Sequence, residues 1–293
     1  MKKINELLKK HNINSLRYEK NGKCTIVYDK DKKYVIKKSK TNIYEYLSYR
    51  NFNNYPNIII DDGYEIREYI EEIDVPIEQK MIDMIYNLSL LHKKTTYYKK
   101  INEYNFENLY EDIKNKIDNS LNIYNELITR IENTTYMSPS DYYLARNISK
   151  VYTNINYSID NINKWYNHLK SKDRLRVSVI HNNLSVEHYI NDMFISWDNS
   201  KIGIPVIDLY HLYLNSYDKY DWNELLNIYL DNYPLKEEEI ELFYSLISIP
   251  DIPNVTSIEI DNVKDIYNKL NYIKLANELI SKRTIEKGIK SEV

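Results

Sequence analysis

The sequence predicts an α+β fold of two lobes, a small antiparallel β lobe followed by a larger, mainly helical lobe. Short alternating runs separated by turn residues fill residues 1–74. From Pro76 onward the apolar residues recur at helical spacing. The 293 residues are enough to bury about three quarters of the unfolded chain's surface, as one large or two modest domains require. We therefore expect an N-lobe at 1–74 and a C-lobe at 75–293.

The N-lobe is expected to contain five antiparallel strands and two helices. The strands are predicted at 15–20, 23–29, 33–38, 57–60 and 64–70, and the helices at 2–11 and 42–52. Asn21-Gly22, between the first two strands, is the clearest of these signals, because Asn-Gly suits the two-residue turn of a β-hairpin.

The C-lobe is expected to be helical, with a few short strands in its middle. Helices are predicted at 77–92, 105–133, 140–170, 206–214, 222–232, 236–247 and 263–286. Short β-like runs at 177–180, 187–190 and 193–197 interrupt them. Ser140 or Asp141 is expected to cap the helix at 140–170, since both residue types favour the N-cap position.

Charge and cysteine content argue against several classes of protein. The balance of 40 Lys and Arg against 43 Asp and Glu gives a net charge of −3, whereas nucleic-acid binders usually carry a basic excess. The single Cys24 permits neither an intrachain disulfide nor a metal cluster built on thiolates. No apolar run approaches the roughly 18 residues of a membrane span, and residues 1–10 lack the apolar centre of a signal peptide. The expected location is the cytoplasm.

Three segments in the second half of the chain carry closely spaced polar residues. They are His181-Asn182-Asn183-Leu184-Ser185-Val186-Glu187-His188, Phe194-Ile195-Ser196-Trp197-Asp198 and Gly203-Ile204-Pro205-Val206-Ile207-Asp208-Leu209. Their order and spacing resemble the catalytic core of the aminoglycoside phosphotransferase and choline kinase-like superfamily. Those kinases carry His-Gly-Asp-x-x-x-x-Asn, then Ile-Asp-Trp-Glu, then Gly-Asp-Pro-x-x-Asp-Leu. Tyr34-Val35-Ile36-Lys37 and Leu91-His92 extend the resemblance, which implies a protein-kinase-like fold. Within the superfamily, the chain looks nearest to the degenerate spore-coat kinase-like branch.

The resemblance implies a supporting role for four residues. Lys37 matches the nucleotide-binding lysine of the third strand, and Glu45 on the following helix matches its ion-pair partner. His181 matches the histidine beneath the catalytic loop. Asp208 matches the buried aspartate that holds the loop backbone from the next helix.

The residues that should perform the chemistry depart from the family pattern. Phosphoryl transfer needs a carboxylate at the attacking hydroxyl and oxygen ligands for Mg²⁺. The matching positions hold Asn183, which cannot accept a proton, His188, a poor ligand for a hard cation, and Ser196, a neutral hydroxyl. Asp198 lies two residues after Ser196, so on a strand it would share that face and could reach a cation after a small shift.

Each residue also has a purely structural interpretation. His181 taken alone is a hydrogen-bonded core histidine, and His188 is a hairpin side chain. Lys37 can belong to the solvated run Lys37-Lys38-Ser39-Lys40, and Asp208 can be an early-helix acid favoured by the helix dipole. Gly22 is the only glycine of the first hairpin, where a phosphate-binding loop would need more.

The leading hypothesis is a pseudokinase: a kinase-like protein that acts by binding a small ligand in the interlobe cleft or a protein partner, with a spore-associated role implied by the resemblance. No cofactor is expected, with binding of ATP and Mg²⁺ weak or absent, and no nucleic acid. The alternative is an active phosphotransferase that phosphorylates an alcohol group and uses Asp198 for Mg²⁺. A third hypothesis places a protein partner on an external, Tyr-rich face.

Overall fold

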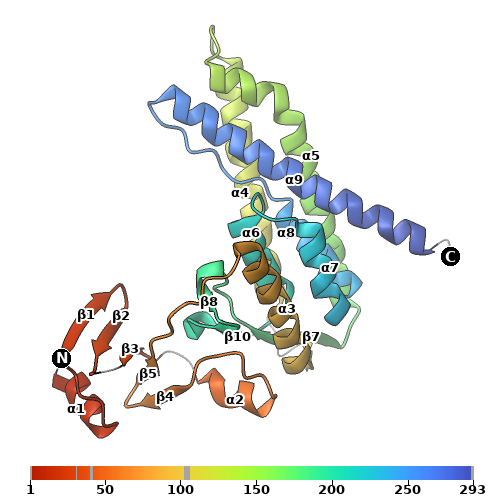
Figure 1. Ribbon diagram of the computed structural model, residues 1–293. Helices are drawn as coiled ribbons and strands as arrows, with labels where there is room; N and C mark the ends of the chain where they lie inside the picture. The colour runs from red at the N-terminus through yellow and green to blue at the C-terminus, as the bar shows by residue number, and fades with distance from the viewer. Residues whose placement is uncertain (1, 31, 40–41, 102–105, 292–293) are drawn as a thin grey trace. The chain divides into compact units, whose positions relative to one another are not determined.

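The computed structural model describes residues 2–30, 32–39, 42–101 and 106–291, with side chains from residue 3 to residue 282 (Figure 1). The chain divides into two compact units. The first comprises Met1–Thr95 and Ser178–Gly203, and the second comprises Thr96–Val177 and Ile204–Val293. The α+β fold with an antiparallel N-terminal sheet and a mainly helical remainder is confirmed. The lobe boundary between residues 74 and 75 stays a prediction.

The N-terminal sheet has the five strands that the alternation predicts. They are β1 (Arg17–Asn21), β2 (Cys24–Tyr28), β3 (Lys33–Lys38), β4 (Ile58–Asp61) and β5 (Tyr64–Glu68). Their spatial order is β1-β2-β3-β5-β4, and every neighbouring pair is antiparallel. Gly22 lies at the first central position of the β1–β2 turn with a φ of 56°, which glycine adopts without the strain of a Cβ atom.

One face of this sheet forms the core of the N-terminal region with helix α1 (Lys2–Lys10). Leu7 and Leu8 of α1 pack against the sheet. The sheet residues buried in this core are Val27, Ile36 and Ile66, from three adjacent strands. Because side chains alternate along a strand, Lys37 and Glu65, each next to one of these core residues, project from the opposite face.

The rest of the described first unit consists of two α-helices, two short 3-10 turns and a group of short strands. Helix α2 (Ile43–Tyr49) follows β3, and α3 (Ile77–Thr95) follows the sheet. Strand β7 (Arg174–Ile180) begins in the second unit, where it pairs with β6 (Tyr97–Lys100), and ends in the first, where it pairs with β10 (Lys201–Gly203). The hairpin β8 (Tyr189–Ile190) and β9 (Met193–Phe194) lies between them in sequence. The alternation missed β6 and β10, because segments of three or four residues are too short to establish a period.

The second unit is helical. Its helices are α4 (Phe106–Glu132), α5 (Pro139–Lys170), α6 (Val206–Ser216), α7 (Trp222–Asn232), α8 (Glu237–Ile247) and α9 (Glu259–Ser291). Helix α5 packs against α4, α8 and α9. Residue 105, the predicted start of α4, lies outside the described residues. The cap of α5 is Ser138, whose side chain accepts a hydrogen bond from the Asp141 backbone N–H, so the predicted cap at Ser140 or Asp141 is wrong by two or three residues. Pro139 explains the shift, because proline favours the first helical position.

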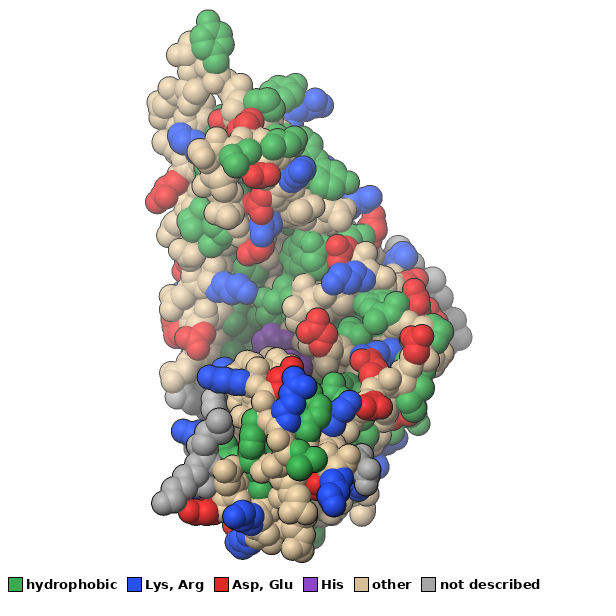
Figure 2. Space-filling view, turned by 60° about the vertical axis from the view of Figure 1, so that its left-hand side comes forward, with side chains coloured by type: hydrophobic (Ala, Val, Ile, Leu, Met, Phe, Trp, Pro, Cys, Tyr) green, Lys and Arg blue, Asp and Glu red, His purple; other side chains and the backbone are tan. Residues whose placement is uncertain are grey.

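Two surface properties bear on the class of protein. On the face shown in Figure 2, Lys and Arg side chains are intermingled with Asp and Glu. Such mixing is unlike the single-signed stripe of a nucleic-acid binder. Among the described residues, no helix has both the length and the apolar content to cross a membrane.

Candidate functional site: an ion cluster around Lys37

Lys37 lies at the centre of a buried group of charges in the first unit. Its Nζ atom is 3.0 Å from Asp198 Oδ2 and 3.5 Å from Glu65 Oε2. The side chains of Lys37 and Glu65 are 9% and 3% exposed, whereas that of Asp198 is 29% exposed. Low exposure strengthens these charge interactions, because water screens them less. The interpretation of Lys37 as part of a solvated run is therefore wrong: the strand turns this lysine inward.

The fold fixes Glu65 opposite Lys37. The two residues are direct partners in the β3–β5 register, and β4 pairs with the other edge of β5 through Ile60. The Tyr44 hydroxyl, from α2, donates a hydrogen bond of 3.0 Å to Glu65 Oε2. Burial raises the pKa of the Tyr44 phenol, and the Glu65 charge raises it further, so the hydroxyl keeps its proton and remains a donor.

Glu45 is not the partner of Lys37. It lies one residue after Tyr44 on α2 but is exposed, while Tyr44 is buried. Successive helical residues point about 100° apart, so the helix that directs Tyr44 toward the sheet directs Glu45 elsewhere. Glu65 takes the place expected of Glu45, and sequence analysis missed it. The sequence shows a charged residue in a β run beside the core position Ile66. It does not show that β3 and β5 pair, because these strands are separated in sequence, and only that pairing places Glu65 opposite Lys37.

His181 supports the hairpin segment from within. It follows β7, is fully buried, and its Nε2–H donates a hydrogen bond of 2.8 Å to the Ile195 carbonyl. Its ring meets the buried Trp197 ring edge-on at a centroid distance of 4.9 Å. This geometry is compatible with both interpretations of His181, a core histidine and a support for the loop.

The loop after His181 is closed by a local hydrogen bond. His188 Nδ1–H donates to the Asn183 carbonyl at 2.7 Å, because a carbonyl oxygen can only accept. Asn182, at the position of the family glycine, adopts a φ of 58°, a conformation that asparagine tolerates better than most residues. The loop is therefore held by a contact between its own residues and by a left-handed turn at Asn182.

Asp198 reaches Lys37 by a route different from the predicted one. The expected strand at 193–197 ends at Phe194, and Ser196 takes a left-handed conformation with a φ of 66°. Trp197–Asn199 then forms a single 3-10 turn. Ser196 and Asp198 therefore do not share one face of a strand, contrary to the prediction from the sequence. The turn carries the Asp198 carboxylate to the lysine.

Asp208 belongs to the second unit. It lies in the first turn of α6 and is fully buried. Its neighbours in sequence, Leu209 and Tyr210, are also buried, so α6 is an interior helix. Its place in the first turn of the helix agrees with the early-helix interpretation, and its supporting role for the loop stays a prediction.

Five of the predicted residues of the first unit form two groups, and Glu45 and Ser196 join neither of them. Lys37 and Asp198 meet, together with Glu65 and Tyr44. His181 lies beside His188, at a ring-centroid distance of 6.2 Å, and His188 is bonded to Asn183. Across the described part of the chain, no three His, Cys, Asp or Glu side chains converge as a metal-binding group. Asn183, His188 and Ser196 offer an amide, an imidazole and a hydroxyl, a donor set that does not fit Mg²⁺.

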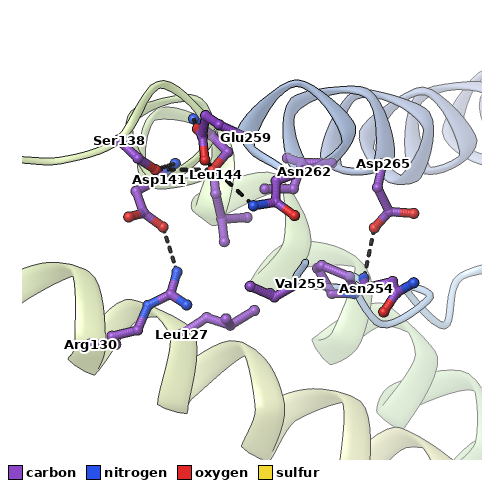
Figure 3. Close-up of a pocket in the computed structure, with 13 residues that line it drawn as sticks. Leu127, Arg130, Ser138, Asp141, Leu144, Asn254, Val255, Glu259, Asn262 and Asp265 are labelled. Carbon is purple, nitrogen blue, oxygen red and sulfur yellow. Dashed lines mark hydrogen bonds and ion pairs between the residues drawn. The ribbon is translucent and has the colours of Figure 1, made fainter. Parts of the chain in front are cut away.

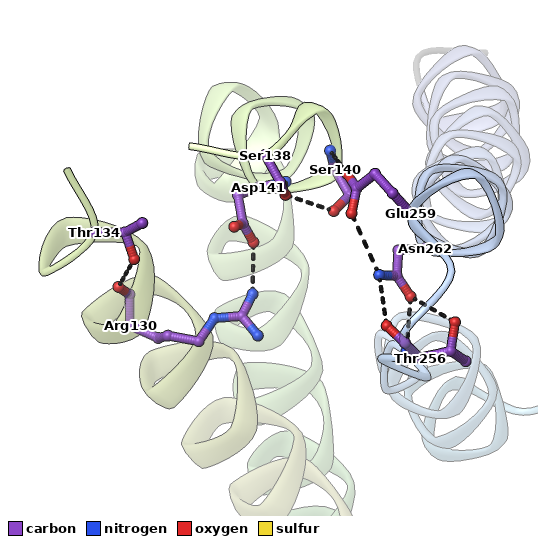
Figure 4. A network of polar contacts seen from close by, with 8 residues as sticks. All are labelled: Arg130, Thr134, Ser138, Ser140, Asp141, Thr256, Glu259 and Asn262. Atoms are coloured by element: carbon purple, nitrogen blue, oxygen red, sulfur yellow. Dashed lines mark hydrogen bonds and ion pairs between the residues drawn. The ribbon is translucent and has the colours of Figure 1, made fainter. Parts of the chain in front are cut away.

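A second candidate is a small cavity of about 140 Å³ where α4, α5 and α9 meet (Figure 3). Its polar side chains are occupied with one another. Arg130 binds Asp141 at 2.5 Å, and Glu259 accepts a hydrogen bond from the Ser140 backbone N–H at 2.6 Å. Asn262 is bonded to Thr256 through both its amide nitrogen and its oxygen (Figure 4). This network joins helix ends, so we assign the cavity a structural role.

The fold is that of known small-molecule kinases. No family model matches the sequence, and no curated protein matches it. Among solved structures, the chain is similar to an aminoglycoside phosphotransferase from Alicyclobacillus acidocaldarius, with a TM-score of 0.66, 10% identity, and 92% of each chain covered. It is similar to the choline kinase LicA from Streptococcus pneumoniae, with a TM-score of 0.51 and 17% identity over 92% of this chain and 98% of the other. It is also similar to the AMP-bound complex of a spectinomycin phosphotransferase, with a TM-score of 0.55 and 12% identity over 94% of this chain and 97% of the other. The resemblance read from the sequence motifs is confirmed at the level of the fold.

Proposed function

We propose that this protein is a pseudokinase: it keeps the fold of a small-molecule kinase and acts by binding a ligand or a protein partner, without efficient phosphoryl transfer. One observation carries the proposal. Positions 183, 188 and 196, which match the base and the metal ligands of the family pattern, hold no carboxylate. The spore-associated role suggested by the sequence resemblance is part of the same proposal.

The chemistry of the replaced positions supports it. Asn183 cannot deprotonate an attacking hydroxyl, and Ser196 brings no charge to a metal. Loss of a single electrostatic contact in an active site commonly costs about 3–4 kcal/mol of barrier, or 10²–10³ in rate. The three losses are not additive, because all would serve one reactive state. Turnover is expected to stay at background.

One observation favours an active phosphotransferase as the second candidate. The Asp198 carboxylate lies beside Lys37, although the matching metal position is Ser196. A carboxylate in this place could hold Mg²⁺ against a bound nucleotide, if it left the lysine. Fold alone does not decide between the two candidates, since one fold supports many activities.

Thermal unfolding with and without ligand separates them. We expect ATP to raise the melting temperature little, and equally with Mg²⁺ or with EDTA. A ligand at 100 times its Kd stabilises by about 2.7 kcal/mol, so weak binding is still visible at millimolar concentration. The accompanying assay follows ADP release with a panel of small alcohols. Mg²⁺-dependent phosphorylation that disappears in Asp198→Ala would overturn the proposal and establish the second candidate.

A further inference from the structure

The two carboxylates that bind Lys37 differ in how firmly the fold holds them. Glu65 lies on β5, which is hydrogen-bonded to β3 on one side and to β4 on the other. Its carboxylate is nearly inaccessible to solvent and also accepts the Tyr44 hydrogen bond. Moving Glu65 would break the hydrogen bonds between β5 and its neighbouring strands, or would leave the buried Tyr44 hydroxyl without its acceptor. Both changes cost free energy of folding.

Asp198 has much weaker support. It lies in a turn of three residues. Its carboxylate accepts a hydrogen bond from the Lys37 ammonium group. Almost a third of its side chain is exposed, so it can rotate into water. A carboxylate that moves into solvent regains hydration, and Lys37 keeps Glu65 as its counter-ion when Asp198 leaves.

The charges on this face of the sheet favour replacement of Asp198 over addition of a further anion. In the group around Lys37, the cations are Lys37 and Arg67, and the anions are Glu65 and Asp198; Lys33 lies on the same face but is paired with Glu71. Arg67 lies two residues after Glu65, on the same side of β5; burial lowers the pKa of its guanidinium, while the Glu65 charge opposes that effect. A third anion would leave the group with a net negative charge, which is unfavourable away from water. A phosphate group that takes the place of Asp198 adds less negative charge to the group than one that joins both carboxylates, because the Asp198 charge leaves as the phosphate enters.

We infer that Glu65 is the permanent counter-ion that positions Lys37, and that Asp198 is an exchangeable internal anion that a ligand's phosphate group must displace to reach the lysine. The first half is independent of the proposed function. The second half rests on it, since it takes this face as the ligand site. Glu65 is a positioning residue here, and Asp198 closes the site in the absence of ligand.

The pairing is tested by a rescue experiment on stability. Lys37→Met leaves a buried Glu65 carboxylate without its cation, and we expect the melting temperature to fall by roughly 5–10 °C. Adding Glu65→Gln, which keeps the shape and removes the charge, should restore at least half of the loss. The matched control is Lys37→Met with Glu45→Gln, which should restore none. Rescue by the position 45 variant, or equal effects of both, would overturn the assignment of Glu65.

Displacement is tested with inorganic pyrophosphate in EDTA, measured by calorimetry. Asp198→Asn should tighten binding roughly 10-fold, because one competing charged hydrogen bond to Lys37 is removed. Glu187→Gln, an exposed acid on the same segment, is the control and should match the wild type. Unchanged or weaker binding to Asp198→Asn would overturn the displacement. Asp198→Asn keeps both Lys37 and Glu65, so it tests the displacement of Asp198 even if Lys37→Met fails to fold. Kinase turnover would defeat the pseudokinase proposal alone and leave the stability rescue unaffected.

Discussion

Replacement of Arg176 by methionine is expected to destabilise the helical unit by about 3–5 kcal/mol, the usual cost of leaving one member of a buried ion pair alone. Arg176 Nε donates to Glu239 Oε1 at 2.8 Å, and Nη2 binds the other carboxylate oxygen. The two side chains are 11% and 1% exposed. Nη2 also donates to the Pro234 carbonyl at 2.9 Å, and the guanidinium lies 4.3 Å from the Tyr233 ring centroid.

The pair holds two segments of the second unit together, since Arg176 belongs to β7 and Glu239 to the first turn of α8. Burial of the guanidinium disfavours its charge, but the hydrogen bond and the charge of Glu239 outweigh burial and raise the pKa of Arg176. Methionine keeps much of the packing volume. The loss measured for Arg176→Met is therefore mainly that of the paired charge.

The comparison variant is Arg174→Met, two residues earlier on the same strand, at an exposed position. Its unfolding free energy in urea should stay within about 0.5 kcal/mol of the wild type. The double variant Arg176→Met with Glu239→Gln should recover much of the stability, because no buried charge then lacks a partner. Equal losses for the two arginine variants would show that the Arg176 pair contributes nothing special.

The strands and helices were predictable because their signals are local. Alternation placed β3 at its observed bounds, and helical spacing did the same for α7. Asn21-Gly22 predicted the turn, although its two central residues are Gly22 and Lys23, one position later than expected. The errors fall where local rules compete: proline moved the start of α5, and a left-handed Ser196 ended the predicted strand at 193–197.

The candidate site was predictable only in part, for a physical reason. Lys37 and Asp198 are 161 residues apart, and Lys37 and Glu65 meet through a strand pairing that skips β4. Spacing in a sequence does not state which strands become neighbours. Family resemblance supplied Lys37, but it supplied the wrong carboxylate, Glu45, because in this chain the sheet and not the helix provides the counter-ion.

Restoring the missing metal set is expected to create a response to Mg²⁺ that the wild type lacks. The variant combines Asn183→Asp, His188→Asn and Ser196→Asp, which returns the carboxylates and the amide that phosphoryl transfer needs. The backbone can accept the change at position 196, because aspartate is among the residues that tolerate the left-handed conformation found there. We expect ATP to stabilise this variant more with Mg²⁺ than with EDTA, and ATP turnover to exceed that of the wild type by at least about 10²-fold.

The sharpest control combines Asn183→Asp and His188→Asn with Ser196→Asn. It differs from the triple variant only at position 196, where an uncharged amide replaces the carboxylate. It keeps the size and backbone preference of the residue at 196 but brings no charge to the metal. If the three groups serve a single magnesium-bound state, this control should stay near the wild type, since effects within one such state are not additive. A control as active as the charged variant would mean that Asp198 already supplies the metal carboxylate. A wild type that turns ATP over above background, at the same rate as both variants, would contradict the pseudokinase proposal, because the replaced positions would then not limit activity.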